Sequence, residues 1–83
     1  MTQKTIVITG ASSGIGKATA LYFHEKGWNV VATMRNPKNE QDLKEDDRMK
    51  IVELDVENKE SIQQAVQTIL STFDTVDVWL NNA

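Results

Sequence analysis

The sequence predicts an α/β fold in which helices cover both faces of a doubly wound parallel sheet, and two observations carry this prediction. Short apolar runs rich in β-branched residues alternate with amphipathic or polar stretches along the whole chain. A glycine-rich turn follows the first apolar run directly. Such alternation is typical of βαβ units, whose right-handed crossovers place the second and third strands on one side of the first strand. With the fourth strand on the other side, the expected strand order is 3-2-1-4, the first half of a doubly wound sheet.

The first helix is expected between two apolar runs, TIVIT at 5–9 and WNVVATM at 28–34, which we predict to be strands. Residues 17–27 between them carry apolar side chains at helical spacing and end in Gly27, a typical helix stop. The residues expected to contact the sheet are Ile15, Ala18, Leu21 and Tyr22.

The second half of the chain begins with a polar stretch, 35–48, that contains the only proline and predicts a loop with at most one short helix. A third strand is expected at 50–56. The next helix should begin at Asn58 as its N-cap, with Glu60 in its first turn. Its apolar face comprises Ile62, Ala65, Val66, Ile69, Leu70 and Phe73. The last strand is expected at 76–82, where the apolar residues are typical of a buried parallel strand.

Composition narrows the classes of function. The 83 residues are 40% hydrophobic and 25% charged, as in a small soluble domain, and the net charge of -3 argues against a nucleic-acid-binding protein. Basic residues are scattered, so no patch for a membrane surface stands out, and no run approaches the ~20 apolar residues that cross a bilayer. Without cysteine the chain has no disulfide and no cysteine-ligated metal site, and a cytoplasmic location is expected.

The glycine-rich turn GASSGIG joins the first strand to the first helix with the spacing G-x-x-x-G-x-G. Gly10 can adopt the backbone angles of a tight turn, Gly14 leaves room for a phosphate, and Gly16 lets the helix pack closely on the strand. The free N–H groups at the start of the helix, together with the hydroxyls of Ser12 and Ser13, would bind the phosphate. The turn therefore predicts a dinucleotide site, and the alternative is a tight turn that binds nothing.

Arg35 indicates which dinucleotide is bound. An acidic residue about 20 positions after the glycines commonly holds the ribose 2′-hydroxyl of NAD, whereas an arginine accommodates the 2′-phosphate of NADP. No Asp or Glu occurs between Gly27 and Glu40, and Arg35 ends the second strand, where the ribose is expected. We therefore expect NADP(H) in preference to NAD(H), and the alternative is an arginine that is merely solvated.

Three motifs resemble those of the short-chain dehydrogenase/reductase family. TGASSGIG at 9–16 fits the branch with G-x-x-x-G-x-G spacing and not the extended branch, and LDV at 54–56 and NNA at 81–83 match two further motifs. The resemblance covers nearly the whole chain and implies a Rossmann-like domain of which residues 1–83 are the N-terminal dinucleotide-binding part. One departure is that Ser13 stands where some NADP-dependent members carry a basic residue.

The resemblance also implies roles for individual residues. Asp55 would meet the adenine amino group with help from the Val56 backbone, although Asp55 could instead be a turn residue before the second helix. Asn82 and Ala83 would lie beside the adenosine ribose, and Asn81 would tie the central strands together. The full set of expected cofactor-binding residues is Gly10, Ser12, Ser13, Gly14, Ile15, Gly16, Arg35, Asp55, Val56, Asn82 and Ala83.

The catalytic serine, tyrosine and lysine of the family would fall beyond Ala83, so the resemblance implies no catalytic residue in this chain. Tyr22 and Lys26 do have the family's Tyr-x-x-x-Lys spacing. They lie, however, on the helix that starts at the phosphates and extends away from them, so we interpret them as a core tyrosine and a solvated lysine. No metal site is expected.

The resemblance implies that the complete protein is an NADP(H)-dependent oxidoreductase that transfers hydride between the nicotinamide and a small carbonyl or alcohol substrate. Residues 1–83 alone are expected to be inactive, and the complete protein is expected to form homo-oligomers, as family members usually do. The alternative is a non-catalytic nucleotide-binding or interaction module, in which an exposed fourth strand pairs with a partner or a second copy.

Overall fold

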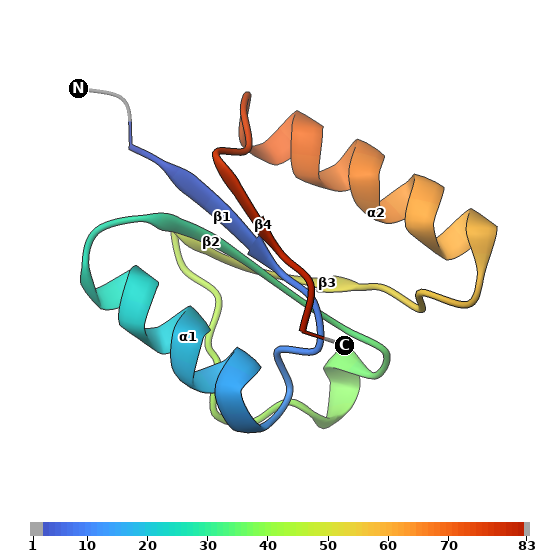
Figure 1. The fold of residues 1–83 in the computed structure, drawn as a ribbon, viewed down its shortest axis with the longest axis horizontal. Helices are drawn as coiled ribbons and strands as arrows, with labels where there is room; N and C mark the ends of the chain where they lie inside the picture. The colour runs from blue at the N-terminus through green and yellow to red at the C-terminus, as the bar shows by residue number, and fades with distance from the viewer. Residues whose placement is uncertain (1–2, 83) are drawn as a thin grey trace.

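The computed structural model describes residues 3–82, and its elements follow the predicted alternation of strands and helices (Figure 1). The elements are β1 (Thr5–Ile8), α1 (Gly14–Glu25), β2 (Asn29–Met34), the 3₁₀ helix η1 (Pro37–Asn39), β3 (Met49–Glu53), α2 (Lys59–Thr72) and β4 (Val78–Leu80). All strand pairs are parallel, and the sheet has the order β3-β2-β1-β4. The predicted order 3-2-1-4 of a doubly wound half-sheet is therefore confirmed.

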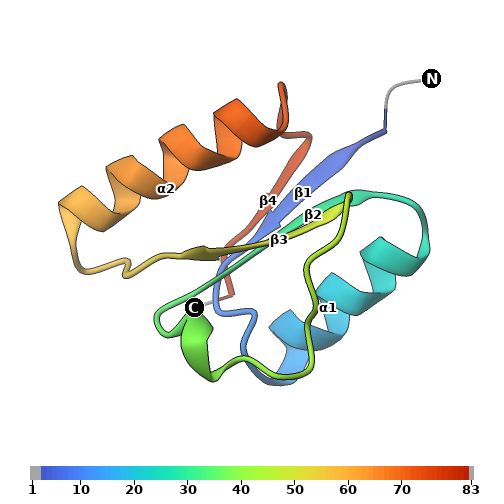
Figure 2. The same ribbon diagram turned by 180° about the vertical axis from the view of Figure 1, so that it is seen from behind.

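The core consists of two layers, one on each face of the sheet, because successive side chains of a strand point to opposite faces. Ile6 and Ile8 of β1 belong to the cluster that packs against α1, whereas Val7 packs with Ile69 of α2 on the other face. Figures 1 and 2 show the two helices on opposite sides of the sheet. Every residue of β1 is buried, in keeping with the continuous apolar run from Ile6 to Ile8.

The predicted sheet-facing side of α1 is wrong. Ile15 and Tyr22 are 75% and 55% exposed, and Leu21 and Ala18 are exposed as well. The residues of α1 that pack against the sheet are instead Ala20 and the partly buried Phe23, and Gly16 is buried against the glycine-rich turn. Small side chains let a helix approach a sheet closely, so the size of the residues decides this face more than their hydrophobicity does.

Gly27 ends α1 as predicted, with a left-handed φ of 91°. The N–H of Trp28 donates to the carbonyl of Phe23 at 3.0 Å, and the N–H of Gly27 donates to that of His24 at 3.1 Å. This pair of hydrogen bonds is the Schellman arrangement, in which a glycine accepts backbone angles that other residues resist. The rings of Phe23 and Trp28, whose centroids lie 4.8 Å apart, supply the hydrophobic contact that accompanies it.

The connection from β2 to β3 runs alongside α1 (Figure 2). It contains only η1 as regular structure, as the sequence predicts. Near the end of the connection, Asp46 Oδ2 lies 2.7 Å from His24 Nε2. Arg48 Nη1 donates to the carbonyls of His24 at 2.6 Å and Trp28 at 3.2 Å. These contacts hold the connection to the C-terminal end of α1.

Helix α2 begins as predicted, because the side chain of Asn58 accepts hydrogen bonds from the N–H groups of Glu60 and Ser61 at 2.9 and 3.2 Å. Its apolar face is only half covered. Ala65 and Ile69 are buried and Phe73 packs against the same cluster. Ile62, Val66 and Leu70 are exposed, with Leu70 the most exposed at 53%. Neither α1 nor α2 is long and apolar enough to cross a membrane.

The last strand is shorter and more open than the sequence suggests. Strand β4 pairs with β1 alone, so it lies at the edge of the sheet among the described residues. Val78 is 40% exposed and Trp79 is 44% exposed, which contradicts the expected buried strand. The apolar composition correctly indicates a strand but does not indicate how much of it the rest of the chain covers.

Candidate cofactor-binding site

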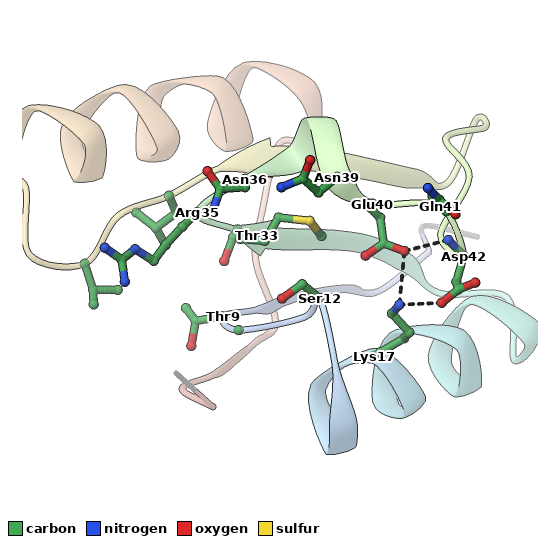
Figure 3. A pocket seen from close by; sticks show the side chains of 14 residues that line it. Thr9, Ser12, Lys17, Thr33, Arg35, Asn36, Asn39, Glu40, Gln41 and Asp42 are labelled. Atoms are coloured by element: carbon green, nitrogen blue, oxygen red, sulfur yellow. Dashed lines mark hydrogen bonds and ion pairs between the residues drawn. The ribbon is translucent and has the colours of Figure 1, made fainter.

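A pocket of about 500 Å³ lies at the carboxyl edge of the sheet (Figure 3). This edge is where open parallel sheets bind their ligands. The lining comes from four parts of the chain: the glycine-rich turn with the first turn of α1, the end of β2, the stretch after η1, and the loop after β3. The lining residues are Thr9, Gly10, Ser12, Lys17, Thr33, Met34, Arg35, Asn36, Asn39, Glu40, Gln41, Asp42, Leu54 and Val56.

The glycine-rich turn has the backbone shape that its glycines predict. Gly10 and Gly14 have φ values of 63° and 58°, in the left-handed region that other residues rarely adopt. A Cβ built at Gly14 would have no atom within 4 Å, so the space beside it is open. Ser12 lines the pocket, whereas Ser13, Gly14 and Ile15 are exposed beside it without lining it.

The start of α1 offers unsatisfied N–H groups. Its N-cap residue, Ser13, makes no side-chain hydrogen bond to the helix, in contrast to Asn58 at the start of α2. The first N–H groups of a helix have no partner within the helix, and the helix dipole favours an anion beside them. The turn therefore presents donors of the kind that bind a phosphate, next to the open space at Gly14.

Gly16 permits a close approach between α1 and the turn. A Cβ there would collide with the carbonyl oxygen of Gly10 and would lie 2.5 Å from Asn82 Nδ2. The prediction that Gly16 allows close packing is confirmed, with the difference that its neighbours are the turn itself and Asn82 rather than the strand.

Asn82 ties the end of the described chain to the turn. Its N–H donates to Thr9 Oγ1 at 2.8 Å, and its Nδ2 donates to the carbonyl of Gly10 at 3.1 Å. The resemblance gave Asn81 the role of tying the central strands together, and that role stays a prediction. In the structure, Asn81 Oδ1 accepts a hydrogen bond from Trp79 Nε1 at 3.1 Å. The role of Asn82 beside the ribose stays a prediction, and Ala83 lies outside the described residues.

Arg35 lies directly after β2, is exposed and lines the pocket (Figure 3). Within residues 3–82, no hydrogen bond or ion pair engages its guanidinium. The five donors of an arginine are therefore available to a ligand. The placement agrees with the position at which the sequence predicts a contact with the 2′-phosphate.

The LDV motif at 54–56 is divided between the pocket and a turn, because β3 ends at Glu53 and leaves Asp55 and Val56 in the loop that follows. Val56 lines the pocket, but Asp55 does not. Asp55 Oδ1 accepts a hydrogen bond from the N–H of Glu57 at 3.0 Å, and the Asp55 N–H donates to Ser61 Oγ at 2.9 Å. These bonds correspond to the turn residue that was the alternative interpretation of Asp55, and its contact with adenine stays a prediction.

Three charged residues of the pocket were absent from the predicted set. Lys17 Nζ lies 3.3 Å from Glu40 Oε2 and 2.6 Å from Asp42 Oδ2. Glu40 Oε2 also accepts hydrogen bonds from the N–H groups of Asp42 at 2.7 Å and Leu43 at 2.8 Å. Lys17 and Asp42 are 25 residues apart, so no short sequence spacing indicates that they are in contact. The single leucine in an otherwise polar stretch was the available signal, because Leu43 is buried and holds this stretch against the core.

The pKa values of the three groups agree with their geometry. The hydrogen bond to Asp42 raises the pKa of Lys17 above its ordinary value, and the same contact lowers the pKa of Asp42. Burial pushes the pKa of Glu40 upward, but the N–H groups of Leu43 and Asp42, together with Lys17, outweigh burial and hold it below its ordinary value. All three groups are therefore charged at neutral pH.

Acid should destabilise the fold through these carboxylates and through Asp46, whose pKa is lowered chiefly by the N–H of Arg48. A carboxylate with a lowered pKa in the folded state contributes stability that is present above its unfolded pKa and is lost as the pH falls through the folded value. The unfolded values are 4.5 for Glu40 and 3.8 for Asp42 and Asp46. We therefore expect the free energy of unfolding to be constant from about pH 7 to about pH 5 and to fall below that.

Urea unfolding at a series of pH values checks this expectation. Asp46→Asn should lower the stability at neutral pH and make its dependence on acid shallower. Asp74→Asn is the matched control, because Asp74 is exposed and has no hydrogen bond or ion pair to any residue that the structure describes. Equal acid dependence in the wild type and in Asp46→Asn would contradict the role assigned to Asp46.

Acidic and histidine side chains do not gather into a metal site in the described part of the chain, where no group of three or more His, Cys, Asp or Glu could hold an ion. His24 is paired with Asp46 on the far part of α1. Tyr22 is 55% exposed and lies beneath Lys26 Nζ, 5.4 Å from its ring centroid. The predicted core position of Tyr22 is thus wrong, and the pair is a surface contact on α1.

Comparisons with known proteins agree with this geometry. The family model for the short chain dehydrogenases matches residues 4–83. An uncharacterized oxidoreductase of Staphylococcus aureus strain USA300 is 38% identical over 86 residues, an alignment that covers 100% of this chain and 37% of the relative. The chain thus spans little more than a third of the length of that curated relative.

Solved structures show the same arrangement of elements. A short-chain dehydrogenase from Streptomyces avermitilis superposes with a TM-score of 0.87 and 33% identity, over 95% of this chain and 30% of the other. The N-domain of a bacterial malonyl-CoA reductase, in a crystal structure with NADP, superposes with a TM-score of 0.86 and 26% identity. That match covers 96% of this chain and 16% of the other.

Proposed function

Because the chain belongs to the short-chain dehydrogenase family, we propose that residues 1–83 form the cofactor-binding part of an NADP(H)-dependent oxidoreductase. In the complete protein, hydride would pass between the nicotinamide and a small carbonyl or alcohol substrate. The catalytic residues would lie outside this chain. We further propose a cytoplasmic, homo-oligomeric enzyme, in keeping with the absence of cysteine from the sequence and with the family.

The observation that carries the proposal is the position of Arg35 on a pocket that also contains the start of α1. A guanidinium with free donors binds phosphate oxygens well, and often in a two-pronged manner. The dinucleotide phosphates would lie at the N–H groups of the glycine-rich turn, with Ser12 as a further donor. The adenosine end would extend toward Arg35 and Val56, with Asn82 near the ribose.

The surroundings of Glu40 also favour NADP(H) over NAD(H). An NAD-binding site needs an acceptor for the ribose 2′-hydroxyl. Glu40 lines the pocket, but its side chain is 2% exposed, and its Oε2 already accepts from Lys17 and two backbone N–H groups. The crystal structure of a similar domain with NADP gives further support.

Calorimetric titration of the complete protein with NADPH and with NADH tests the proposal. We expect NADPH to bind at least about tenfold more tightly, a difference of about 1.4 kcal/mol, which a single charged contact can supply. Tighter binding of NADH would overturn the preference for NADP(H). Failure of both cofactors to bind would overturn the proposed function as a whole.

A second candidate function is an interaction module, favoured by the exposed side chains of β4 and α2. Trp79 on the edge strand lines a shallow apolar pocket together with the exposed Ile62 and Val66 of α2, and such a face can pair with another chain. The same titration separates the candidates, since a module without a nucleotide site would bind neither cofactor.

A further inference from the structure

Lys17, Glu40 and Asp42 form an ion-pair cluster, which we name the clasp, across one end of the pocket (Figure 3). Lys17 stands in the first half of α1, close after the glycine-rich turn. Its two partners follow η1 in the connection from β2 to β3. The clasp thus joins two walls of the pocket that are far apart in sequence.

The two carboxylates of the clasp differ in their surroundings. The side chain of Glu40 is 2% exposed, and its oxygen also holds the backbone of Asp42 and Leu43 in a turn. The side chain of Asp42 is 70% exposed, and its contact with Lys17 is the shorter one, at 2.6 Å. Glu40 therefore shapes the wall, whereas Asp42 can be replaced with little disturbance of the core.

The clasp is the polar connection between these two walls. Asn39, Glu40, Gln41 and Asp42 line the pocket, as do Gly10 and Ser12 of the turn. Leu43 anchors the same stretch in the core cluster that contains Ala11 and Ala20, but within residues 3–82 no other hydrogen bond or ion pair joins residues 36–43 to residues 10–25. The contacts of His24 with Asp46 and Arg48 lie further along, at the other end of α1. The polar restraint on the distance between the walls at the pocket therefore depends on Lys17.

The clasp also sets the charge of the pocket. Two carboxylates surround the ammonium of Lys17, so the cluster as a whole carries no net positive charge. Arg35 is then the cation of the pocket lining that is available to an anionic ligand. The raised pKa of Lys17 and the lowered pKa of Asp42 are in keeping with a stable ion pair.

We propose that the clasp positions the pocket wall for the adenosine end of the cofactor, so that Lys17 and Asp42 set cofactor affinity without contacting the reacting atoms. This inference rests on the proposed NADP(H)-binding function. A positioning role requires that replacing either Lys17 or Asp42 weakens the binding of NADPH. A purely electrostatic role requires effects of opposite sign. Loss of Lys17 would then weaken the binding of the anionic cofactor, and loss of Asp42 would strengthen it.

The experiment is a double-mutant cycle on the complete protein with Lys17→Ala, Asp42→Ala and the combined variant. NADPH affinity is measured by calorimetry, and KM and kcat are measured with a carbonyl substrate on which the wild type is active. We expect each single variant to bind NADPH about 3- to 5-fold more weakly, as befits one partly exposed ion pair. The combined variant should bind NADPH no more weakly than Lys17→Ala, because that substitution already removes the contact between Lys17 and Asp42.

Lys38→Ala is the matched control for Lys17→Ala, because it removes the same charge. Lys38 is exposed in η1 without lining the pocket and has no partner among the described residues. Its affinity should equal that of the wild type. Because the clasp only positions the wall, the KM for NADPH should rise in the clasp variants while kcat stays unchanged. Thermal melting of each variant shows whether it is folded. Lys17→Arg, which keeps the charge that pairs with Asp42, should restore affinity, and this separates a positioning role from a loss of folding.

Tighter binding of NADPH by Asp42→Ala would overturn the proposal, because it would indicate a simple charge effect. Additive losses in the combined variant would overturn it as well. If the wild-type protein binds neither cofactor, the proposed function falls first. If the wild type binds NADPH and the clasp variants bind it as well as Lys38→Ala does, only the positioning role of the clasp is overturned.

Discussion

Replacing Arg35 with aspartate is expected to reverse the cofactor preference, with a loss of NADPH affinity of about 100-fold and little loss of NADH affinity. Hydrogen bonds to a charged group contribute about 1.5–3 kcal/mol, and the new carboxylate adds repulsion toward the 2′-phosphate. The same carboxylate can accept a hydrogen bond from the ribose 2′-hydroxyl of NADH. Because Arg35 is exposed and unpaired among the described residues, the substitution removes no contact that stabilises the fold.

Calorimetric dissociation constants for both cofactors measure this effect in the complete protein. Lys38→Asp serves as its control, because it makes the same change of charge on the same side of the pocket without facing the ribose. An equal loss for NADPH and NADH, or an effect of similar size in Lys38→Asp, would show that Arg35 acts only through the general field of the protein.

Replacing Gly16 with alanine is expected to have the largest effect on stability. Its methyl group would collide with the carbonyl of Gly10 and would displace the Asn82 side chain, which lies 2.5 Å from the Cβ position. Overpacking costs about 1–3 kcal/mol, and loss of the hydrogen bond between Asn82 and Gly10 costs about 1 kcal/mol more. The better helix propensity of alanine returns up to about 1 kcal/mol. We expect a net loss of about 2 kcal/mol and a cofactor affinity at least about tenfold weaker, because the phosphate-binding turn is displaced.

Gly27→Ala provides the comparison for this effect. Gly27 has a φ of 91°, but a Cβ there would meet no atom within 4 Å. Backbone strain alone then costs about 1 kcal/mol, and cofactor affinity should not change, since Gly27 ends α1 far from the pocket. Urea unfolding of both variants measures the difference. A Gly16→Ala protein as stable as the wild type would refute the close approach of α1 to the turn.

The arrangement of the sheet could be predicted because its determinants are local in the sequence. The apolar run Ile6–Ile8 of β1 is explained by the burial of the strand on both faces of the sheet. Glycine is required at positions 10 and 14 because both residues have left-handed backbone angles. Asn58 could be identified as an N-cap because the cap depends on its own side chain and the next three residues. Each of these features needs no knowledge of distant parts of the chain.

The features that could not be predicted depend on contacts between distant residues. Periodicity placed Ile15 and Tyr22 toward the sheet, whereas close packing at Gly16 and Ala20 turns them outward. Lys17 could not be linked to its partners because the order of charges in a polar stretch does not indicate which of them fold back onto a helix. Hydrophobicity likewise cannot show that Trp79 stays 44% exposed, since exposure depends on what packs against β4.

The hydrogen bonds between the two ends of this chain also determine when the nucleotide pocket is completed during folding. Thr5 and Asp77 are bonded across 72 positions, and Asn82 reaches Thr9 across 73. Contacts between residues this far apart close a long loop and form slowly, whereas the glycine turn itself is a short local segment. The turn therefore receives its last restraint, from Asn82 to Gly10, only after α2 and β4 have docked. On a ribosome, the phosphate-binding turn therefore takes its final shape only after a residue synthesised 72 positions later has folded against it.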